Sequence, residues 1–314
     1  MENKEYKYRF TIFTATYNRA SLLLKLYKCI KNQTYNHDDF EWVIVSDGST
    51  DNTPLVISDF IEEGFIHIKF INKDNGGKHS AWKVATDLFE GRYVVTADDD
   101  DPLPYNMLET YDKYWKELET QEQYKDFWEI KSRCQYEDGT LVGEKLPEPY
   151  FDSDYIEVTY ILKKQAEMDG CRKVEVLRNE AAVPDKFAFQ NMCSNYPEGI
   201  RWARAARKYK TRFVPDITRT YVVGHDSLCI TPVGEKVPTK KLYNSLVGAL
   251  ETINEISDIL WKYDKKQLIK TIFYLTRISI RLGVDSKKFI NQSLVRYTYS
   301  LLYLPALLYN NIKK

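Results

Sequence analysis

The sequence predicts an α/β fold, in which a mostly parallel sheet with helices on both faces is followed by a helical C-terminal region. Three observations predict it. Apolar strand-like runs alternate with amphipathic helical runs in the first part of the 314-residue chain, polar side chains follow each of these strands directly, and the C-terminal part is basic with helical periodicity. Because crossovers of this length join parallel strands, the carboxyl ends of the strands should meet at one edge of the sheet.

Composition limits the size and the partners of the protein. The length suits one large α/β domain with an appendage. Lys+Arg and Asp+Glu balance at 45 each, which gives no sign of a nucleic-acid partner. The balance hides an asymmetry, because residues 236–314 carry 14 Lys/Arg against 5 Asp/Glu, a local charge of +9, and residues 1–235 carry −9. We therefore expect a domain over residues 1–235 and a basic helical region over residues 236–314.

The cysteines and the first residues indicate a cytoplasmic protein. The five cysteines are scattered and include no CxxC pair, which argues for a reducing compartment and against a disulfide framework or a zinc site. The charged start lacks the apolar core of a signal peptide. No run reaches the roughly 18 apolar residues of a membrane-spanning helix.

The first strands and helices follow from periodicity. A buried strand is expected at residues 8–17, and an amphipathic helix from about Ser21 has apolar side chains at helical spacing. The next strand, Trp42–Val45, is followed by Thr and Asp residues that can cap a helix running to about Glu63. The remaining elements of this part are a strand at Phe65–Ile71, a helix at about Ser80–Phe89, and a fourth strand, Tyr93–Ala97, that leads into four aspartates.

The second part of the chain changes character and then becomes helical. Its expected strands are Phe127–Cys134, Thr140–Leu146, Tyr155–Leu162, Lys173–Arg178, Arg212–Val214 and Ile217–Val223. The segment Glu137–Thr140 reads as a hairpin turn. Helices are expected at about Glu198–Tyr209, Thr239–Tyr263, Lys265–Leu282 and Ser286–Ile312, the last broken by Pro305.

Four consecutive carboxylates, Asp98–Asp101, follow the fourth strand directly. In extended backbone, Asp98 and Asp100 share one face, while Asp99 and Asp101 share the other. Two carboxylates on one face at a strand end suit a hard divalent cation that is itself held to a phosphate. The alternative is a solvated acidic turn that caps the following helix.

The other polar clusters suit a nucleotide. Tyr17 can stack on a base, and Asp47 can accept a hydrogen bond from a ring N–H such as that of uracil. Gly76 and Gly77 allow close backbone approach, with Lys78 and the N-terminus of the next helix facing a diphosphate. The alternatives are a turn aromatic, a capping aspartate and an ordinary glycine turn. Neither a GxGxxG fingerprint nor a P-loop is present.

Taken in order, these motifs resemble those of family 2 glycosyltransferases, which have the GT-A fold. The resemblance rests on Thr14-Ala15-Thr16-Tyr17-Asn18-Arg19, Val45-Ser46-Asp47-Gly48-Ser49-Thr50-Asp51, Asn75-Gly76-Gly77 and Asp98–Asp101, and it covers roughly residues 8–225. It implies a nucleotide-binding half at residues 1–110 and an acceptor-side half at residues 111–235. The residues that it assigns to the nucleotide, usually uridine, are Thr14, Ala15, Thr16, Tyr17, Arg19, Asp47, Lys78, Asp98 and Asp99.

The resemblance also implies a bound Mn²⁺ or Mg²⁺. Asp98 corresponds to the first carboxylate of the family's DxD motif, near the ribose, and Asp100 to the second, on the metal. Four aspartates stand where DxDD is usual, so the metal assignment is ambiguous by one residue. Ala15 stands where many members have proline, and we expect little effect. A third metal ligand, often histidine, occurs in this fold near the position of His225; the alternatives are Asp226 or a structural histidine.

A catalytic base is implied within Tyr196–Arg204. When the sequence is aligned with the family's motif on Trp202, Arg204 and Pro215, Glu198 takes the place of the family's aspartate. That aspartate is the general base in inverting members. Glutamate is a departure that adds one methylene of reach. The alternative is an ordinary carboxylate in the first turn of a helix, where the helix dipole favours it.

The sequence therefore predicts a metal-dependent inverting glycosyltransferase that uses a nucleotide-sugar donor, UDP-linked, and a saccharide or lipid-linked acceptor. The resemblance places it in capsule, O-antigen or other cell-envelope polysaccharide synthesis. Its basic C-terminal helices suit the inner surface of the cell membrane; the alternative is a bundle packed on the catalytic domain or on a second copy of the chain. The rival functions are a sugar nucleotidyltransferase and a non-catalytic scaffold with a transferase-like domain.

Overall fold

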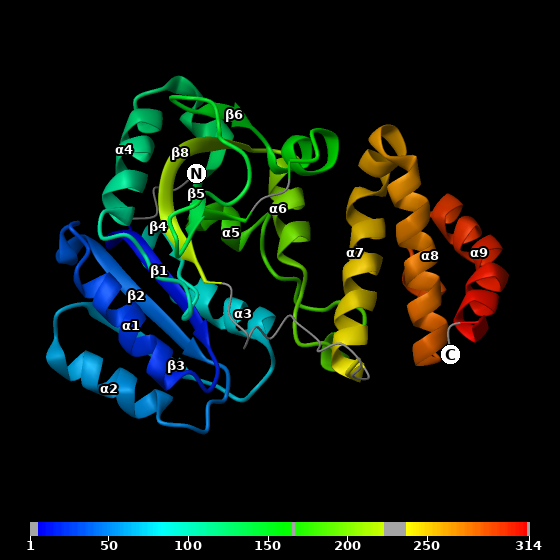
Figure 1. The fold of residues 1–314 in the computed structure, drawn as a ribbon, viewed down its shortest axis with the longest axis horizontal. Coiled ribbons are helices and arrows are strands. Elements are labelled where there is room, and N and C mark those ends of the chain that lie inside the picture. The colour runs from blue at the N-terminus through cyan, green and yellow to red at the C-terminus, as the bar shows by residue number, and fades with distance from the viewer. Residues whose placement is uncertain (1–5, 165–166, 223–236, 313–314) are drawn as a thin grey trace. The chain divides into compact units, whose positions relative to one another are not determined.

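The computed structural model describes residues 6–164, 167–222 and 237–312, and the chain divides into two compact units (Figure 1). The first unit consists of Met1–Tyr155, Gln165–Ala182 and Ala205–Ser227, and the second of Ile156–Lys164, Val183–Arg204 and Leu228–Lys314. The predicted boundary at residue 235, between a catalytic domain and a basic helical region, stays a prediction. The compact units divide the chain at other points.

The first unit contains an eight-stranded sheet with the strand order β3-β2-β1-β4-β7-β5-β8-β6. Its strands are β1 (Tyr8–Thr16), β2 (Phe40–Ser46), β3 (His67–Asn72), β4 (Gly91–Thr96), β5 (Phe127–Tyr136), β6 (Phe151–Ser153), β7 (Met168–Lys173) and β8 (Lys210–Tyr221). β1 pairs in parallel with β2 and β4, and β2 with β3, as the crossovers predict. β7 runs antiparallel between β4 and β5, so the sheet is mixed beyond β4.

Helices cover both faces of this sheet. The first unit contains the helices α1 (Ala20–Lys31), α2 (Thr53–Glu63), α3 (Lys78–Leu88), α4 (Met107–Glu119) and α5 (Val174–Arg178). It also contains the short helical turns η1 (His37–Asp39) and η2 (Glu122–Asp126). One core cluster joins alternate side chains of β1, β2 and β4 to α1, α2 and α4. On the other face, Phe13 packs its ring against Trp82 of α3 and Phe89. The prediction that helices cover both faces of the sheet is confirmed.

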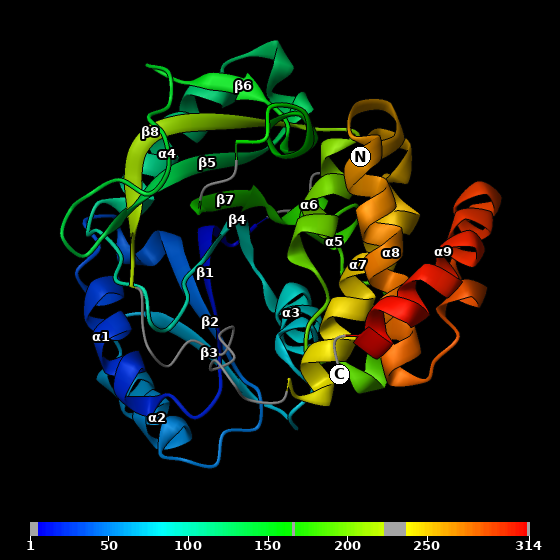
Figure 2. The same cartoon turned by 45° about the vertical axis from the view of Figure 1, so that its right-hand side comes forward.

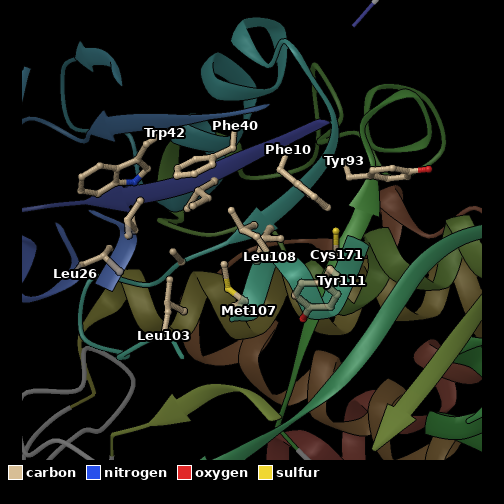
Figure 3. Close-up of a cluster of buried hydrophobic side chains, with 14 of the residues drawn as sticks. Phe10, Leu26, Phe40, Trp42, Tyr93, Leu103, Met107, Leu108, Tyr111 and Cys171 are labelled. Atoms are coloured by element: carbon tan, nitrogen blue, oxygen red, sulfur yellow. The ribbon is translucent and has the colours of Figure 1, made fainter. Parts of the chain in front are cut away.

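Large aromatic side chains fill the core between the sheet and α4. Figure 3 shows Phe10, Phe40 and Trp42 on the sheet above Leu108 and Tyr111, and all of them are fully buried. The Tyr93 ring stacks on Trp115 at a centroid distance of 4.1 Å. Such rings bury much apolar area each, so this layer fixes where β4 ends and α4 begins.

The segment between residues 137 and 178 differs from its prediction. The turn at Glu137–Thr140 forms, but only an isolated bridge, from Gln135 to Leu141, follows it. Three expected strands are wrong: Thr140–Leu146 has no strand, Tyr155–Leu162 contains the π-helical turn η3 (Glu157–Ile161), and Lys173–Arg178 is largely α5. Two strands of this part, β6 and β7, were not predicted. β6 is only three residues long, and β7 (Met168–Lys173) contains neither β-branched nor aromatic residues, so neither carries the pattern by which a strand is recognised.

β8 replaces the two strands predicted around Pro215. It runs parallel to β5, and its register shifts so that Phe213 lies opposite Lys131 but Ile217 lies opposite Arg133. A second shift follows at once, since Arg219 lies opposite Cys134. These bulges accommodate Pro215, which has no N–H to donate, without ending the strand.

The second unit is helical. Its elements are η3 (Glu157–Ile161), η4 (Gln190–Met192), α6 (Glu198–Ala206, whose last two residues belong to the first unit), α7 (Thr239–Tyr263), α8 (Lys265–Leu282), η5 (Ser286–Phe289) and α9 (Ser293–Ile312). The bounds of α7 and α8 are those predicted. The third helix begins later than expected, and it continues through Pro305 rather than breaking there. Figures 1 and 2 show α8 between α7 and α9. Among the described helices, none has the length and apolar content to cross a bilayer.

A buried ion pair joins β5 to β7. Arg172 donates from Nε to Oε1 of Glu129 at 2.8 Å, and the two side chains are 7% and 0% exposed. Thr211 of β8 donates to the other carboxylate oxygen of Glu129 at 3.1 Å. One carboxylate thus connects three adjacent strands in the mixed half of the sheet.

Replacing Arg172 with Met should destabilise the protein by about 3–5 kcal/mol, because it leaves the Glu129 carboxylate buried without its cation. The double variant Glu129→Gln/Arg172→Met should recover much of that loss. Urea unfolding of both variants checks this. The surface pair Lys208–Glu180, with side chains 63% and 19% exposed, is the control, and Lys208→Met should change stability far less than Arg172→Met. Equal losses in the single and double variants would contradict this assignment.

Candidate active site

The loops that follow β1, β2, β3 and β4 lie at one edge of the sheet, and they are bonded to one another. Asn18, after β1, accepts at Oδ1 from the backbone N–H of Thr50, after β2, at 2.7 Å, and its own N–H donates to Ser49 Oγ at 2.9 Å. Asn18 has φ +53°, which asparagine tolerates better than most residues. The predicted convergence of the strand ends is therefore present in the structure.

Asp47, at the end of β2, clamps the loop after β3. Its carboxylate accepts from Lys73 Nζ at 2.6 Å and from the backbone N–H groups of Gly76 and Gly77 at 2.9 and 2.7 Å. Burial would raise the pKa of Asp47, but Lys73 and the two amide donors outweigh it and hold that pKa below its ordinary value. An ionised carboxylate offers about four acceptor positions, so little capacity remains for a base N–H.

Gly48 is needed beside this clamp. It has φ +81°, and a Cβ placed on it would lie 2.7 Å from the backbone nitrogen of Asn75. The same Asn75 donates from Nδ2 to the carbonyl of Asp47 at 2.9 Å. The loops after β2 and β3 therefore approach as closely as glycine permits.

The aspartate run forms a turn, in which the N–H of Asp101 donates to the carbonyl of Asp98 at 3.3 Å. The expected extended backbone is wrong, yet the expected grouping of side chains holds. Asp98 and Asp100 are 34% and 41% exposed, whereas Asp99 and Asp101 are 5% and 4% exposed. Two carboxylates therefore remain accessible to a ligand, and two are held inside.

Asp99 ties β4 to β1. It accepts from Thr16 Oγ1 at 2.7 Å and from Arg19 Nη1 at 2.6 Å. Burial raises the pKa of Asp99 in spite of these two donors. Arg19 also donates from the same nitrogen to Asp100 at 2.8 Å. Asp99 thus acts as a structural anchor at this edge, and Arg19 reaches the exposed Asp100.

Two further cations lie beside Asp98. Lys78, the first residue of α3, places Nζ 3.2 Å from Asp98 Oδ1, and Arg219 of β8 places Nη1 3.6 Å from Oδ2. The positive charges of Lys78, first, and Arg219 hold the pKa of Asp98 below its ordinary value. This carboxylate is therefore ionised at neutral pH and faces two cations that can also meet an anionic ligand.

Arg219 is a site residue that the sequence did not reveal. Its guanidinium is 6% exposed and lies 3.5 Å from Asp101 Oδ2 and 2.6 Å from Glu167 Oε1. Asp101 also accepts from the backbone N–H of Val222 at 3.1 Å, and burial raises its pKa to about 6. The signal for Arg219 was weak, because nothing local relates a strand residue to an acidic turn more than a hundred residues earlier.

The remaining predicted residues are placed unevenly. Thr14 is buried, donating to the Ala97 carbonyl and accepting from Trp42 Nε1, so its side chain supports the sheet. Ala15 follows within β1, and Tyr17 is exposed after it. Glu198 begins α6, where a helix was expected to start, and it belongs to the second unit. His225 and Asp226 lie outside the described residues.

The carboxylates at this edge of the sheet can be tested for their fit to a divalent cation. Within residues 6–164, 167–222 and 237–312, no group of three or more His, Cys, Asp or Glu side chains is arranged to hold a metal ion. Mg²⁺ and similar ions are commonly bound through one or two carboxylates, with substrate phosphates and water completing the shell. The partly exposed Asp98 and Asp100 fit a cation of that kind.

Comparison with known proteins identifies relatives. Residues 11–133 match the model of the family described as glycosyl transferase family 2. The chain is 27% identical over 123 residues to the minor teichoic acid biosynthesis protein GgaB of Bacillus subtilis, which covers 38% of this chain and 14% of GgaB. It is 27% identical over 93 residues to the poly(ribitol-phosphate) β-N-acetylglucosaminyltransferase TarS of Staphylococcus aureus, covering 30% of this chain and 16% of TarS. These alignments span a minor part of either relative.

Solved structures share the fold. Residues 1–349 of S. aureus TarS, in complex with UDP, superpose with a TM-score of 0.59 at 14% identity, covering 98% of this chain and 92% of that one. The mannosyltransferase PcManGT of Pyrobaculum calidifontis, in complex with GDP-Man and Mn²⁺, gives a TM-score of 0.54 at 16% identity, with 98% and 88% covered. At these identities the likeness shows the fold alone, and the predicted GT-A fold is confirmed.

Replacing Gly48 with Ala should separate the loops after β2 and β3. We expect a loss of about 2–5 kcal/mol, from left-handed backbone strain together with overlap against Asn75. Gly139 is the matched control, because it has the same φ of +81° but nothing within 4 Å of an added Cβ. Gly139→Ala should therefore show the strain alone, about 1–2 kcal/mol. Chemical denaturation measures both, and equal losses would contradict the close approach at Gly48.

Proposed function

The chain belongs to glycosyl transferase family 2 through residues 11–133, and we propose that it is a metal-dependent, inverting glycosyltransferase. Its donor is a nucleotide sugar, UDP-linked, and its acceptor is a hydroxyl group of a saccharide or lipid-linked molecule. The product belongs to a cell-envelope polysaccharide. Residues 1–110 bind the nucleotide in this proposal, residues 111–235 contribute the acceptor side, and residues 236–314 form the basic helical region.

One observation carries the proposal. At the carboxyl end of the parallel strands, the accessible carboxylates of Asp98 and Asp100 lie beside the cations of Arg19, Lys78 and Arg219. In open α/β sheets, ligands bind at this end of the strands. Carboxylates for a cation and cations for phosphate oxygens are both needed by a nucleoside diphosphate that binds with a metal ion.

The relatives support the choice of donor and acceptor. TarS is named for transferring N-acetylglucosamine to poly(ribitol-phosphate), and its structures include UDP and UDP-GlcNAc. GgaB is named for minor teichoic acid biosynthesis. PcManGT binds GDP-Man with Mn²⁺, so a divalent ion occurs in this fold with a different base. We propose Mn²⁺ or Mg²⁺ here, with a UDP-linked donor.

The proposed donor site divides its work between residues. Tyr17 offers an exposed ring for a base, and Asp47 holds the loop that Gly76 and Gly77 form beside it. Asp100 would hold the cation, with Asp98 near the ribose. When bound, that ion supplies positive charge to the diphosphate leaving group. The Lys78 ammonium adds a second positive charge at the N-terminus of α3, where helix dipoles favour anions.

We assign the base to Glu198 because of its place in the Tyr196–Arg204 motif. In the proposed step, the Glu198 carboxylate takes the proton of the acceptor hydroxyl as that oxygen forms a bond to the anomeric carbon. The bond from the anomeric carbon to the diphosphate oxygen breaks, and the nucleoside diphosphate leaves with the electron pair. Attack from the opposite side inverts the anomeric configuration.

Nucleotide binding should depend on the exposed carboxylates. Asp100→Asn should weaken UDP binding in the presence of Mn²⁺ about tenfold or more, because one charged donor to the cation is lost. Isothermal titration calorimetry with UDP, with Mn²⁺ and with EDTA, checks this. Asp138→Asn, in an exposed turn of the same unit, is the control and should leave UDP binding unchanged. If neither EDTA nor Asp100→Asn changes the affinity for UDP, the proposed metal site is wrong.

Turnover should depend on Glu198 in a different way. Glu198→Gln should reduce UDP release from UDP-sugars about a hundredfold or more, since the amide cannot accept the proton, while UDP binding is retained. A panel of UDP-sugars, assayed with polyol-phosphate and lipid-linked acceptors, provides the measurement, and Glu180→Gln serves as the control. Full turnover in Glu198→Gln would remove the assigned base. Release of pyrophosphate instead of UDP would indicate a sugar nucleotidyltransferase. If no nucleotide sugar is turned over, with or without Mn²⁺, the protein would be a non-catalytic scaffold.

A further inference from the structure

The outer face of α9 carries a continuous apolar stripe. Its five side chains follow one another at intervals of three, four, three and four residues, so they lie on one side of the helix. Each is 56–63% exposed, and they are Leu294, Tyr297, Leu301, Leu304 and Leu308. Soluble monomers seldom expose an apolar patch larger than a few hundred Å², and larger ones usually mark an interaction site.

The opposite side of α9 is already occupied. Val295, Tyr299 and Ala306 are buried on that side. Arg277 of α8 donates to Asn310 Oδ1 at 3.2 Å, and Asn310 donates back to the Arg277 carbonyl at 3.0 Å. Figures 1 and 2 show α9 at the end of the row formed with α7 and α8. The stripe is therefore not the face with which α9 packs on its own unit.

The charges in α9 and in the turn before it are mostly positive. Residues 286–314 contain five Lys or Arg and no Asp or Glu. Lys287 and Lys288 lie exposed in η5, directly before α9. Arg296 is the one charged residue between Ser293 and Ile312. One carboxylate lies close to them in sequence, Asp285, which accepts from the backbone N–H of Lys287 at 3.1 Å, so the segment Asp285–Ile312 keeps a net positive charge.

This charge pattern discriminates between occupants. Two copies of α9 paired in parallel would bring Lys287 and Lys288 of both chains together. An antiparallel pair would bring them towards the end of a helix whose residues, 293–312, include no Asp or Glu. In a parallel pair each chain would offer one carboxylate, Asp285, against two lysines, so like charges disfavour either pairing. An anionic surface meets the same cations favourably, and tyrosine is suited to the boundary between lipid and water.

We propose that α9 is a membrane-docking helix, which lays its Leu294–Leu308 stripe into the surface of an anionic lipid bilayer. In this arrangement the helix lies in the plane of the interface, as amphipathic helices with an apolar face and nearby basic residues do. Lys287 and Lys288 contact lipid phosphates and acidic headgroups. The inference does not depend on the donor site, and it concerns a part of the chain that the family match does not reach.

Vesicle sedimentation of the full chain tests the inference. The protein should sediment with vesicles of phosphatidylcholine containing about 30% phosphatidylglycerol, and at least about tenfold more weakly with phosphatidylcholine alone. Raising the salt concentration should weaken the first interaction. Absence of binding to the anionic vesicles, or equal binding to both kinds, would overturn the proposal.

Two pairs of substitutions separate the apolar and the charged contributions. Leu301→Gln/Leu304→Gln should weaken binding to anionic vesicles about tenfold or more, because two exposed leucines no longer enter the apolar phase. Lys287→Gln/Lys288→Gln should weaken it roughly tenfold to thirtyfold and leave the weak binding to neutral vesicles unchanged. Leu55→Gln is the control, because Leu55 is 66% exposed on α2 in the first unit. It should change nothing.

The alternative occupant has its own signature. Light scattering that shows a dimer, dispersed by Leu301→Gln/Leu304→Gln while vesicle binding persists, would assign the stripe to a second copy and overturn the proposal. The substituted side chains are exposed, so the thermal unfolding temperature should stay within a few degrees of the original. If the double variant is unstable, Leu294→Gln in the first turn of α9 replaces it with the same expectation.

Discussion

Asp99 is a buried carboxylate, held by a hydroxyl from β1 and a guanidinium from the loop after β1. Burial of a charge is costly unless strong donors surround it, and Thr16 and Arg19 are those donors. Because Asp99 is drawn inside, the turn that follows β4 must present Asp98 and Asp100 outward. The same contact fixes Arg19 beside Asp100. The accessible part of the acidic turn therefore depends on an inaccessible one.

The same division recurs along the edge of the sheet. The Asp47 carboxylate accepts hydrogen bonds from the loop after β3. The Asp101 carboxylate lies beside the Arg219 guanidinium and accepts from the backbone N–H of Val222, after β8. Each of these carboxylates fixes a neighbouring loop by charge-assisted hydrogen bonds, which are stronger than neutral ones. The buried carboxylates hold this edge together, and the partly exposed Asp98 and Asp100 remain accessible to a ligand. This arrangement favours Asp47 as a positioning residue for the nucleotide loop rather than as a direct acceptor from a base.

Much of the first half could be predicted from the sequence, because β1 to β4 are long, regular runs separated by helical crossovers. The order of strand ends then follows from parallel pairing, and so does the gathering of Asp47, Lys78 and the acidic turn. The prediction that Asp98 and Asp100 lie on the same side was correct. Its reason was wrong, because a turn, and not extended backbone, brings the two side chains to that side. Prediction failed between residues 137 and 178, where short runs carry no period that distinguishes a strand from a helical turn. Arg219 was missed because its partners are distant in sequence.

The bulges of β8 have a consequence for how this chain can change. Between Phe213 and Arg219, β8 contains more residues than the β5 segment beside it, and this surplus sets the side of the sheet from which Arg219 emerges. Insertion or deletion of a single residue there would turn every later side chain of β8 to the opposite side. The guanidinium would then leave the acidic turn, although no residue of that turn had changed. The number of residues in this stretch is thus more tightly restricted than their identity.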